Sequence, residues 1–518
     1  MAIDLPPPLE PQLAPIEEVR AQSGREVTIE YRGVRIHLSG PAVDSGAVDS
    51  ARLRRDVAAA ETPSDAVRTI GYLYYVSAYP AELTRYAVAG PQDLYVRVVP
   101  GRVERVDGPA RLLPYFSGLS GRTLRCADLE DARILAGGVA ERAGEKYSPA
   151  FRSIGGDRVV LDLGAPAAGG KQMAAAGEFS NYGNRYAGPY LADAALRGSF
   201  GSGDELTLAG ASSVRLLGLG GAHSEPYHEG DAGWSRVTRF GVFGVDGRYA
   251  DFHQAVPIGT LDGSFTTGAA SWLYPVYADF RQRYNLEARL DRSHQSVDAN
   301  LAAGRAEILS EQYNSFELSL SYTGRWQSEG RRMELQAAAT LRKGLGPTAS
   351  PGTPANLAYF VWRPSFEARY GLGPHWTALA AGNFQIGGSV VPQLEQFVVG
   401  GPDSAHAYES GAGVGDHGEN LRLGAEWKGA NDSWYERHGL RPRLFAEYAA
   451  ASLARRNSLG ENAGGVEVAD IGAEAPLKFT SWLAGTLSLA QSVYDHGRQQ
   501  SPDGLARKYV FFKLAAKY

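Results

Sequence analysis

Residues 284–291 read Tyr-Asn-Leu-Glu-Ala-Arg-Leu-Asp, with an apolar or aromatic side chain at every second position and a polar or charged one between. Successive side chains of a β-strand point to opposite faces, so this alternation predicts a strand with one apolar and one hydrated face. The pattern recurs at 316–323 and 421–428. From Lys171 onward, Gly, Asn, Asp and Pro divide the chain into short alternating segments without a long helical pattern. We therefore expect a large antiparallel β domain.

A soluble β-sandwich, with its apolar faces buried in a core, would show the same alternation. Two features favour a transmembrane β-barrel instead. Charged residues occupy the polar faces over hundreds of positions, which suits a water-filled lumen. Aromatic residues gather at predicted strand ends, where a membrane barrel places its interfacial girdles: Trp272, Tyr274, Tyr359, Phe360 and Trp362.

The end of the chain is a third feature that favours a barrel. Val510, Phe512, Leu514, Ala516 and Tyr518 alternate with the residues between them. An amphipathic strand that ends in an aromatic residue is typical of the strand that closes a barrel, here carried by Phe512, Leu514 and Tyr518. At roughly 22 residues per strand with its connection, residues 171–518 supply about 16 strands.

Composition narrows the class of protein further. A chain of 518 residues exceeds what one core usually supports, so we expect two or more folding units. Lys and Arg total 52 against 57 Asp and Glu, which gives no basic surface for a nucleic acid. The single cysteine, Cys126, cannot form an internal disulfide or a multi-thiolate metal site. Without an apolar run approaching about 20 residues, a helical membrane protein is excluded.

The N-terminal part predicts small α+β units. Residues 1–25 are rich in proline and are expected to be a tether with at most a short helix at 16–21. The first ten residues lack the basic and apolar regions of a secretory signal, so a signal would lie outside this numbering.

Between the tether and the barrel we expect two units, at 26–107 and 108–166, followed by the barrel at 167–518. In the first unit the sequence predicts strands at 27–38, 83–88 and 94–106, with helices at 50–60 and from Thr62-Pro63 to about Ser77. The second unit is shorter, with a helix at 127–139 and a strand at 158–163.

Several of these segments together resemble one protein family. Gly71-Tyr72, followed by the strand 94–103 with Gly101, is similar to the end of a first POTRA domain. Residues 181–188 and 203–206 resemble the opening hairpin of the family's barrel, and 396–420 stand where relatives have a long sixth extracellular loop that folds back into the lumen. The hairpin residues that carry the match are Asn181, Gly183, Asn184, Arg185 and Gly188. The sequence thus resembles the two-partner secretion transporters (TpsB), which include the haemolysin and filamentous haemagglutinin exporters.

The loop tip departs from the family pattern. Relatives carry V-R-G-Y/F there, whereas this chain has Ala-His-Ala-Tyr at 405–408, and the partner pattern F-x-D is replaced by Phe445-Ala446-Glu447. Strand alternation directs Phe445 and Glu447 toward the lumen, so we predict that His406 faces Glu447. A His–carboxylate latch would be weaker than the Arg–carboxylate one and pH-dependent near neutrality. Alternatively, Tyr408 packing and backbone contacts hold the loop, and His406 is incidental.

The resemblance implies a pore in the bacterial outer membrane with its POTRA domains in the periplasm. These domains would recognise an unfolded partner, in the simplest case by adding its strand to an exposed sheet edge, and the barrel would pass it outward without ATP. The implied partners are a large β-helical secreted protein, outer-membrane lipid and the barrel assembly machinery.

Three alternatives remain open: an assembly or insertion factor, a passive porin, and an adhesion barrel. No residue pattern for an enzyme, metal or cofactor site stands out, and no plug helix is assigned.

Overall fold

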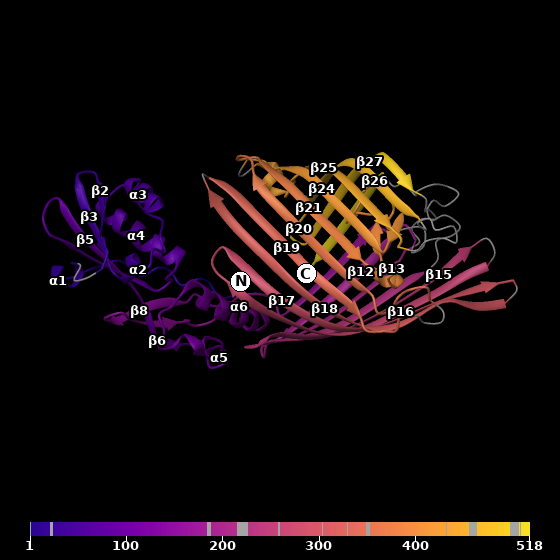
Figure 1. Ribbon diagram of the computed structural model, residues 1–518, viewed down its shortest axis with the longest axis horizontal. Helices are drawn as coiled ribbons and strands as arrows, with labels where there is room; N and C mark the ends of the chain where they lie inside the picture. The colour runs from indigo at the N-terminus through magenta and orange to yellow at the C-terminus, as the bar shows by residue number, and fades with distance from the viewer. Residues whose placement is uncertain are drawn as a thin grey trace.

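The structure is a computed structural model that describes residues 2–20, 24–183, 188–214, 226–256, 259–302, 304–328, 330–348, 353–430, 433–454, 464–497, 507 and 509–518. Two small α/β units precede a β-barrel and lie at one end of it (Figure 1). Among the described residues, no helix is both long and apolar enough to cross a membrane.

The first unit is a five-stranded sheet with two main helices. Its strands lie in the order β1-β4-β5-β3-β2, in which β1 is Gln12–Leu13. The elements are β2 (Val27–Tyr31), β3 (Val34–Ser39), α2 (Pro41–Asp44), α3 (Ser50–Ala58), α4 (Pro63–Ser77), β4 (Glu82–Val88) and β5 (Asp93–Pro100). The side chain of Thr62 accepts a hydrogen bond from the backbone N–H of Asp65 and caps α4, as its sequence predicts. The strand predicted at 27–38 is instead a hairpin, because Arg32 and Gly33 both have positive φ and form a two-residue turn.

The second unit begins at Gly101, earlier than the sequence indicated. A Cβ at Gly101 would lie 2.1 Å from the carbonyl oxygen of Ala81, so only glycine fits where the chain leaves the first sheet. The strand predicted at 94–106 is therefore divided, and its second half joins another sheet of order β6-β9-β8. The elements are β6 (Arg102–Asp107), α5 (Leu113–Phe116), η1 (Ser117–Leu119), α6 (Cys126–Arg142), β7 (Glu145–Lys146), β8 (Ala150–Gly155), β9 (Arg158–Asp162) and β10 (Ala167–Ala168).

The N-terminal segment is packed against both units, although the sequence predicted a tether. Ile3 is buried in the core of the second unit, and Val19 in α1 (Ile16–Val19) is buried against the first. Between them, β1 (Gln12–Leu13) pairs in parallel with β4. Prolines favour extended backbone that can follow a sheet edge, but Pro11 and Pro15 restrict the pairing to a few residues.

The described residues of the larger domain form a closed barrel of 16 antiparallel strands, which confirms the predicted fold class. The strands are β11 (Met173–Ser180), β12 (Leu191–Phe200), β13 (Asp204–Ser213), β14 (Tyr227–Thr238), β15 (Gly241–Val256), β16 (Gly259–Ala278), β17 (Gln282–Leu301), β18 (Gly304–Ser328), β19 (Arg331–Gly344), β20 (Phe360–Gly371), β21 (Trp376–Gly387), β24 (His417–Trp427), β25 (Arg443–Ser452), β26 (Gly465–Lys478), β27 (Leu483–Gly497) and β28 (Val510–Lys517). β28 pairs with both β27 and β11, so the last strand closes the barrel.

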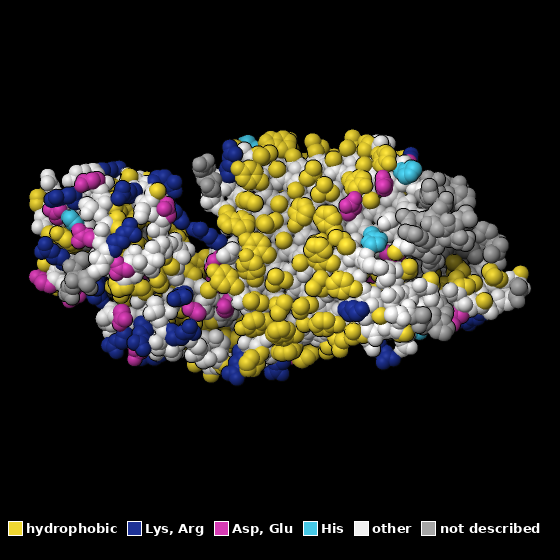
Figure 2. Space-filling model, in the orientation of Figure 1, with side chains coloured by type: hydrophobic (Ala, Val, Ile, Leu, Met, Phe, Trp, Pro, Cys, Tyr) yellow, Lys and Arg dark blue, Asp and Glu magenta, His cyan; other side chains and the backbone are white. Residues whose placement is uncertain are grey.

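The outer face of the barrel is apolar, and charged side chains between these positions point inward. Hydrophobic side chains cover its middle in Figure 2. Exposed members include Leu290, Phe316, Leu318, Leu320, Leu423 and Leu514. Tyr359, which the sequence placed in an aromatic girdle, is instead fully buried beside Tyr313, because it precedes β20 in a loop that folds inward.

The second unit contacts the end of the barrel where β13 starts. Arg142 of α6 donates hydrogen bonds to the carbonyl oxygens of Gly203, at 2.7 Å, and Ser235, at 2.9 Å. Val139 shares a core with Val237 of β14. Because neighbouring strands alternate in direction, β21 runs the same way as β13. The loop that follows β21 therefore lies at the opposite end of the barrel.

Candidate functional site: the loop inside the barrel

The loop at 388–416 connects β21 and β24 and folds into the barrel lumen. It contains η2 (Gln393–Glu395) and a small hairpin of β22 (Phe397–Val399) and β23 (Gly413–Gly415). Ala405, Ala407 and Tyr408 share a buried cluster with Phe445 and Val468 of the barrel wall. On the same strands, Leu444 and Ile471 are exposed on the outside. Since side chains alternate across a strand, the cluster lies inside the barrel.

The loop tip contacts the wall where the sequence predicted. Nδ1 of His406 lies 2.9 Å from Oε2 of Glu447, and the backbone N–H of His406 donates to the same oxygen, also at 2.9 Å. Both side chains are buried, with relative exposures of 2% and 0%. The ring of His406 packs against Phe445, with centroids 4.7 Å apart. The structure thus brings three of the four predicted latch residues into one contact group.

Arg422 of β24 is a fourth member of this group that the sequence analysis missed. Its side chain forms an ion pair with Glu447, and its Nη2 atom lies 2.9 Å from Nδ1 of His406 and 3.0 Å from the carbonyl oxygen of Pro402. The barrel wall therefore supplies a permanent positive charge beside Glu447. Strand alternation places Arg422 on the inner face, but only the register with β25 shows that it faces Glu447.

Tyr408 and backbone atoms of the tip also contact the wall. The structure therefore contains contacts that fit both hypotheses, the His406–Glu447 latch and the packing of Tyr408. The hydroxyl of Tyr408 donates to the carbonyl oxygen of Tyr494 at 3.0 Å and contacts Ser492 of β27. The backbone N–H of Ala407 donates to Oδ2 of Asp470 at 2.8 Å. The tip therefore bridges β24, β25, β26 and β27.

The predicted hairpin residues lie at the barrel seam. Asn181 donates to the carbonyl oxygen of Val510 at 2.9 Å and accepts from the N–H of Phe512 at 2.8 Å, so it joins β11 to β28. A Cβ at Gly183 would lie 1.9 Å from the carbonyl oxygen of Gly188, which requires glycine there. Asn184 and Arg185 lie outside the described residues. Of the closing-strand residues, Leu514 and Tyr518 are exposed, and Phe512 packs against Phe179.

The predicted POTRA residues have local packing roles. A Cβ at Gly71 in α4 would lie 2.8 Å from Oγ1 of Thr84, so glycine lets the helix approach β4. Tyr72 is exposed beside Tyr75, with ring centroids 6.1 Å apart. Among the described strands, the outer ones are β1 and β2 in the first sheet and β6 and β8 in the second. β1 covers the edge of β4, and residues 121–123 form backbone hydrogen bonds with part of β6.

Nearly the whole chain is similar to solved structures, among them the following three. CdiB from Escherichia coli matches with a TM-score of 0.65 and 16% identity, covering 96% of this chain and 91% of that one. CdiB from Acinetobacter baumannii gives 0.61 and 12%, covering 100% and 95%. BamA from Haemophilus ducreyi lacking POTRA domains 1–3 gives 0.52 and 13%, covering 95% and 100%.

No protein-family model matches the sequence, and a search of curated proteins gives no match. At these identities the likeness shows the fold, a 16-stranded barrel preceded by POTRA-type units.

Proposed function

We propose that this chain is an outer-membrane pore that exports an unfolded partner protein, as two-partner secretion transporters do. The observation that carries the proposal is the loop at 388–416, which starts at the barrel end away from the α/β units, occupies the lumen and contacts the wall through His406. The full-length likeness to CdiB, itself a two-partner secretion transporter, supports this reading.

The position of the α/β units indicates the end at which a partner would enter the barrel. The second unit contacts the barrel end at Gly203 and Ser235, and the apolar outer face of the barrel suits membrane lipid. With the units in the periplasm, a captured chain meets the barrel at the end where α6 is docked. Because ATP is absent from the periplasm, folding of the partner outside the cell would give the transport its direction.

Capture of the partner requires an open sheet edge. An extended chain can add a strand to such an edge through backbone hydrogen bonds. The edge of β4 is already covered by β1, and part of the outer edge of β6 bonds to residues 121–123. We therefore expect a strand of a β-helical secreted protein to add to β2 or β8.

An assembly or insertion factor is the second candidate, because BamA has a similar fold. Its TM-score is lower than those of the two CdiB structures, and the transporter reading accounts for the same fold. In the transporter reading, the barrel assembly machinery acts only during biogenesis, when it receives the aromatic closing strand β28.

The proposal is tested by secretion. The chain is expressed behind a functional signal together with the large exported protein encoded beside it, and the medium is assayed with and without residues 26–165. Heat-modifiable mobility in detergent gels checks that each barrel is folded. Export that requires both the chain and residues 26–165 supports the transporter, whereas no export through a correctly inserted barrel favours the assembly factor or a porin.

A further inference from the structure

We propose that Glu395 is a second anchor of the in-folded loop, independent of the latch at His406 and Glu447, and that the pore opens fully only when both are released. The inference deepens the proposed function, since it rests on the barrel being a pore. It concerns the leading segment of the loop, residues 388–396, which enters the lumen before the tip.

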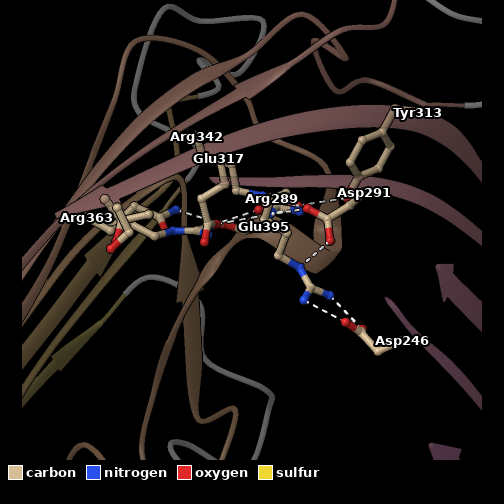
Figure 3. A network of polar contacts seen from close by, with 11 residues as sticks. Asp246, Arg289, Asp291, Tyr313, Glu317, Arg342, Arg363 and Glu395 are labelled. Atoms are coloured by element: carbon tan, nitrogen blue, oxygen red, sulfur yellow. Dashed lines mark hydrogen bonds and ion pairs between the residues drawn. The ribbon is translucent and has the colours of Figure 1, made fainter. Parts of the chain in front are cut away.

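Glu395 is held by side chains from three barrel strands (Figure 3). Its Oε1 atom accepts hydrogen bonds from Nε and Nη2 of Arg342, at 3.0 and 2.9 Å, and from the hydroxyl of Tyr313, at 3.2 Å. Its Oε2 atom accepts from Nη2 of Arg363 at 2.9 Å. The Glu395 side chain is buried, with 5% relative exposure. A buried carboxylate with two arginine partners is a strong, charge-assisted contact.

The backbone of the leading segment is fixed to the same part of the wall. The carbonyl oxygen of Glu395 accepts hydrogen bonds from Nε2 of Gln385 at 2.8 Å and from Nη2 of Arg363 at 2.9 Å. The N–H of Gln393 donates to Glu311 of β18 at 3.0 Å. Side chains of β18, β19, β20 and β21 therefore hold this segment.

The two anchors are on different parts of the barrel. Glu395 contacts β18, β19 and β20, whereas the tip contacts β24, β25, β26 and β27. The loop starts at the end of β21, between these two groups of strands. Breaking the contacts of one group leaves the other group's contacts with the loop intact.

The wall around Glu395 is built so that this carboxylate can leave. Arg342 also pairs with Asp291, at 2.8 Å, and with Glu317, at 3.0 Å. Arg289 pairs with Asp291, at 2.6 Å, and with Asp246, at 2.7 Å. Without Glu395, Arg289 and Arg342 keep the carboxylates of Asp246, Asp291 and Glu317. Arg363 loses its carboxylate partner but is 30% exposed and keeps its hydrogen bond to Gln385, at 2.8 Å.

A departing loop therefore leaves Arg342 with two carboxylate partners in the lumen. Removing one partner of a buried ion pair is costly mainly when the other charge is left uncompensated. Glu395 itself would move into water. These are the properties of an attachment that a translocating chain can displace, in contrast to a permanent structural ion pair.

The test is the open probability of single channels in planar bilayers at pH 7, for Glu395→Gln, Glu447→Gln, the double variant and a variant lacking residues 394–412. Glu426→Gln is the matched control, because Glu426 is a buried lumen carboxylate paired with Arg443, at 2.7 Å, on neighbouring strands. Losing a hydrogen bond to a charged group should raise the open probability about tenfold for Glu395→Gln. The control should stay at the parent value.

A double-mutant cycle separates an anchor from a general weakening of the wall. Independent anchors predict that the effects of Glu395→Gln and Glu447→Gln multiply toward the value of the loop-deleted pore. Arg363→Gln combined with Glu395→Gln should add little, since both remove the same contact. An unchanged open probability in Glu395→Gln, an equal rise in Glu426→Gln, or a closed loop-deleted pore would each overturn the proposal. None of these readouts depends on secretion, so they are separate from a failure of the export function.

Discussion

Arg422 and Glu447 lie directly opposite each other on β24 and β25, and their side chains form an ion pair inside the barrel. Both residues belong to the wall, so neither partner of the pair is supplied by the loop. The loop adds His406, which brings a ring nitrogen and a backbone N–H to the same carboxylate. The latch is thus a preformed wall pair that the loop joins.

The first prediction compares the two partners of Glu447. Arg422→Gln should destabilise the barrel by roughly 3–5 kcal/mol, because it leaves a buried carboxylate without its permanent cation. His406→Ala removes one side-chain contact but keeps the backbone N–H, so it should cost only about 1 kcal/mol. Both destabilisations are measured as the temperature at which the folded barrel changes to its unfolded mobility in a detergent gel. Equal shifts for the two variants would argue against a preformed wall pair.

The pH-sensitive latch stays a prediction. Histidine is the side chain whose charge ordinarily changes between about pH 5 and 8, whereas Arg422 supplies a permanent positive charge beside Glu447. We expect the parent channel to open less often at pH 5 than at pH 8, with a flat profile for His406→Ala. Matching pH profiles of open probability for parent and variant would show that Tyr408 and the backbone contacts, and not the His406 side chain, hold the tip.

A third prediction concerns the first α/β unit. Glu82 is fully buried, and its carboxyl oxygens have no hydrogen-bond partner among the described residues. Burial raises its pKa to about 9 from an ordinary 4.5. The folded unit therefore holds a proton that the unfolded chain releases. The contribution of Glu82 to the free energy of unfolding of this unit is full below about pH 4.5 and falls as pH rises toward about 9.

Glu82→Gln should remove this slope and stabilise the unit at pH 8, because the neutral amide replaces a protonated acid of similar shape. Hydrogen exchange of the α4 and β4 amides in the full-length protein, corrected for intrinsic rates, measures the stability of the unit between pH 5 and 9. If the parent keeps the same protection across this range, Glu82 is not the neutral acid that its burial predicts.

The fourth prediction locates the capture edge. In the β2–β3 hairpin, the residues that flank the two-residue turn form a hydrogen-bonded pair, so the backbone N–H groups of Thr28 and Glu30 point away from β3. Glu30→Pro should remove an outward donor while keeping the hairpin bonds, and it should lower export severalfold. Glu30→Ala is the control. Normal export by Glu30→Pro would assign capture to β8 or to another surface.

Strand faces were predictable from the sequence, but strand partners were not. Alternation placed Phe316 and Leu318 outside and Glu317 inside, because the period of a strand is two residues. The facing of Arg422 and Glu447 depends on the register between β24 and β25, and alternation alone leaves the pairing of two strands undetermined. The contact of Glu395 with Arg342 joins a loop to a distant strand and leaves no local pattern in the sequence.

The N-terminal units were also predictable where the signal lies within a short stretch of sequence, and not where it depends on distant contacts. The cap residue Thr62 and the following Pro63 predicted the start of α4, which depends on local chemistry. The division at Gly101 and the packing of Ile3 into the second unit depend on contacts with Ala81 and Tyr147, which are remote in the sequence. Local signals therefore predicted helices and strands, and tertiary contacts decided where the units begin.

The most direct test of export is to find the partner inside the barrel. A photo-crosslinking residue is placed at Ser319 on the inner face of β18, where its hydroxyl bonds to Thr340 of β19. In a separate variant it is placed at the neighbouring Leu318, which is exposed on the outer face. The partner is stalled during export by fusing a fast-folding domain to its end. We predict that illumination links the stalled partner to position 319 and leaves 318 unlinked. A partner that reaches the medium without crosslinking at 319, or that crosslinks equally at both positions, would contradict transport through the lumen.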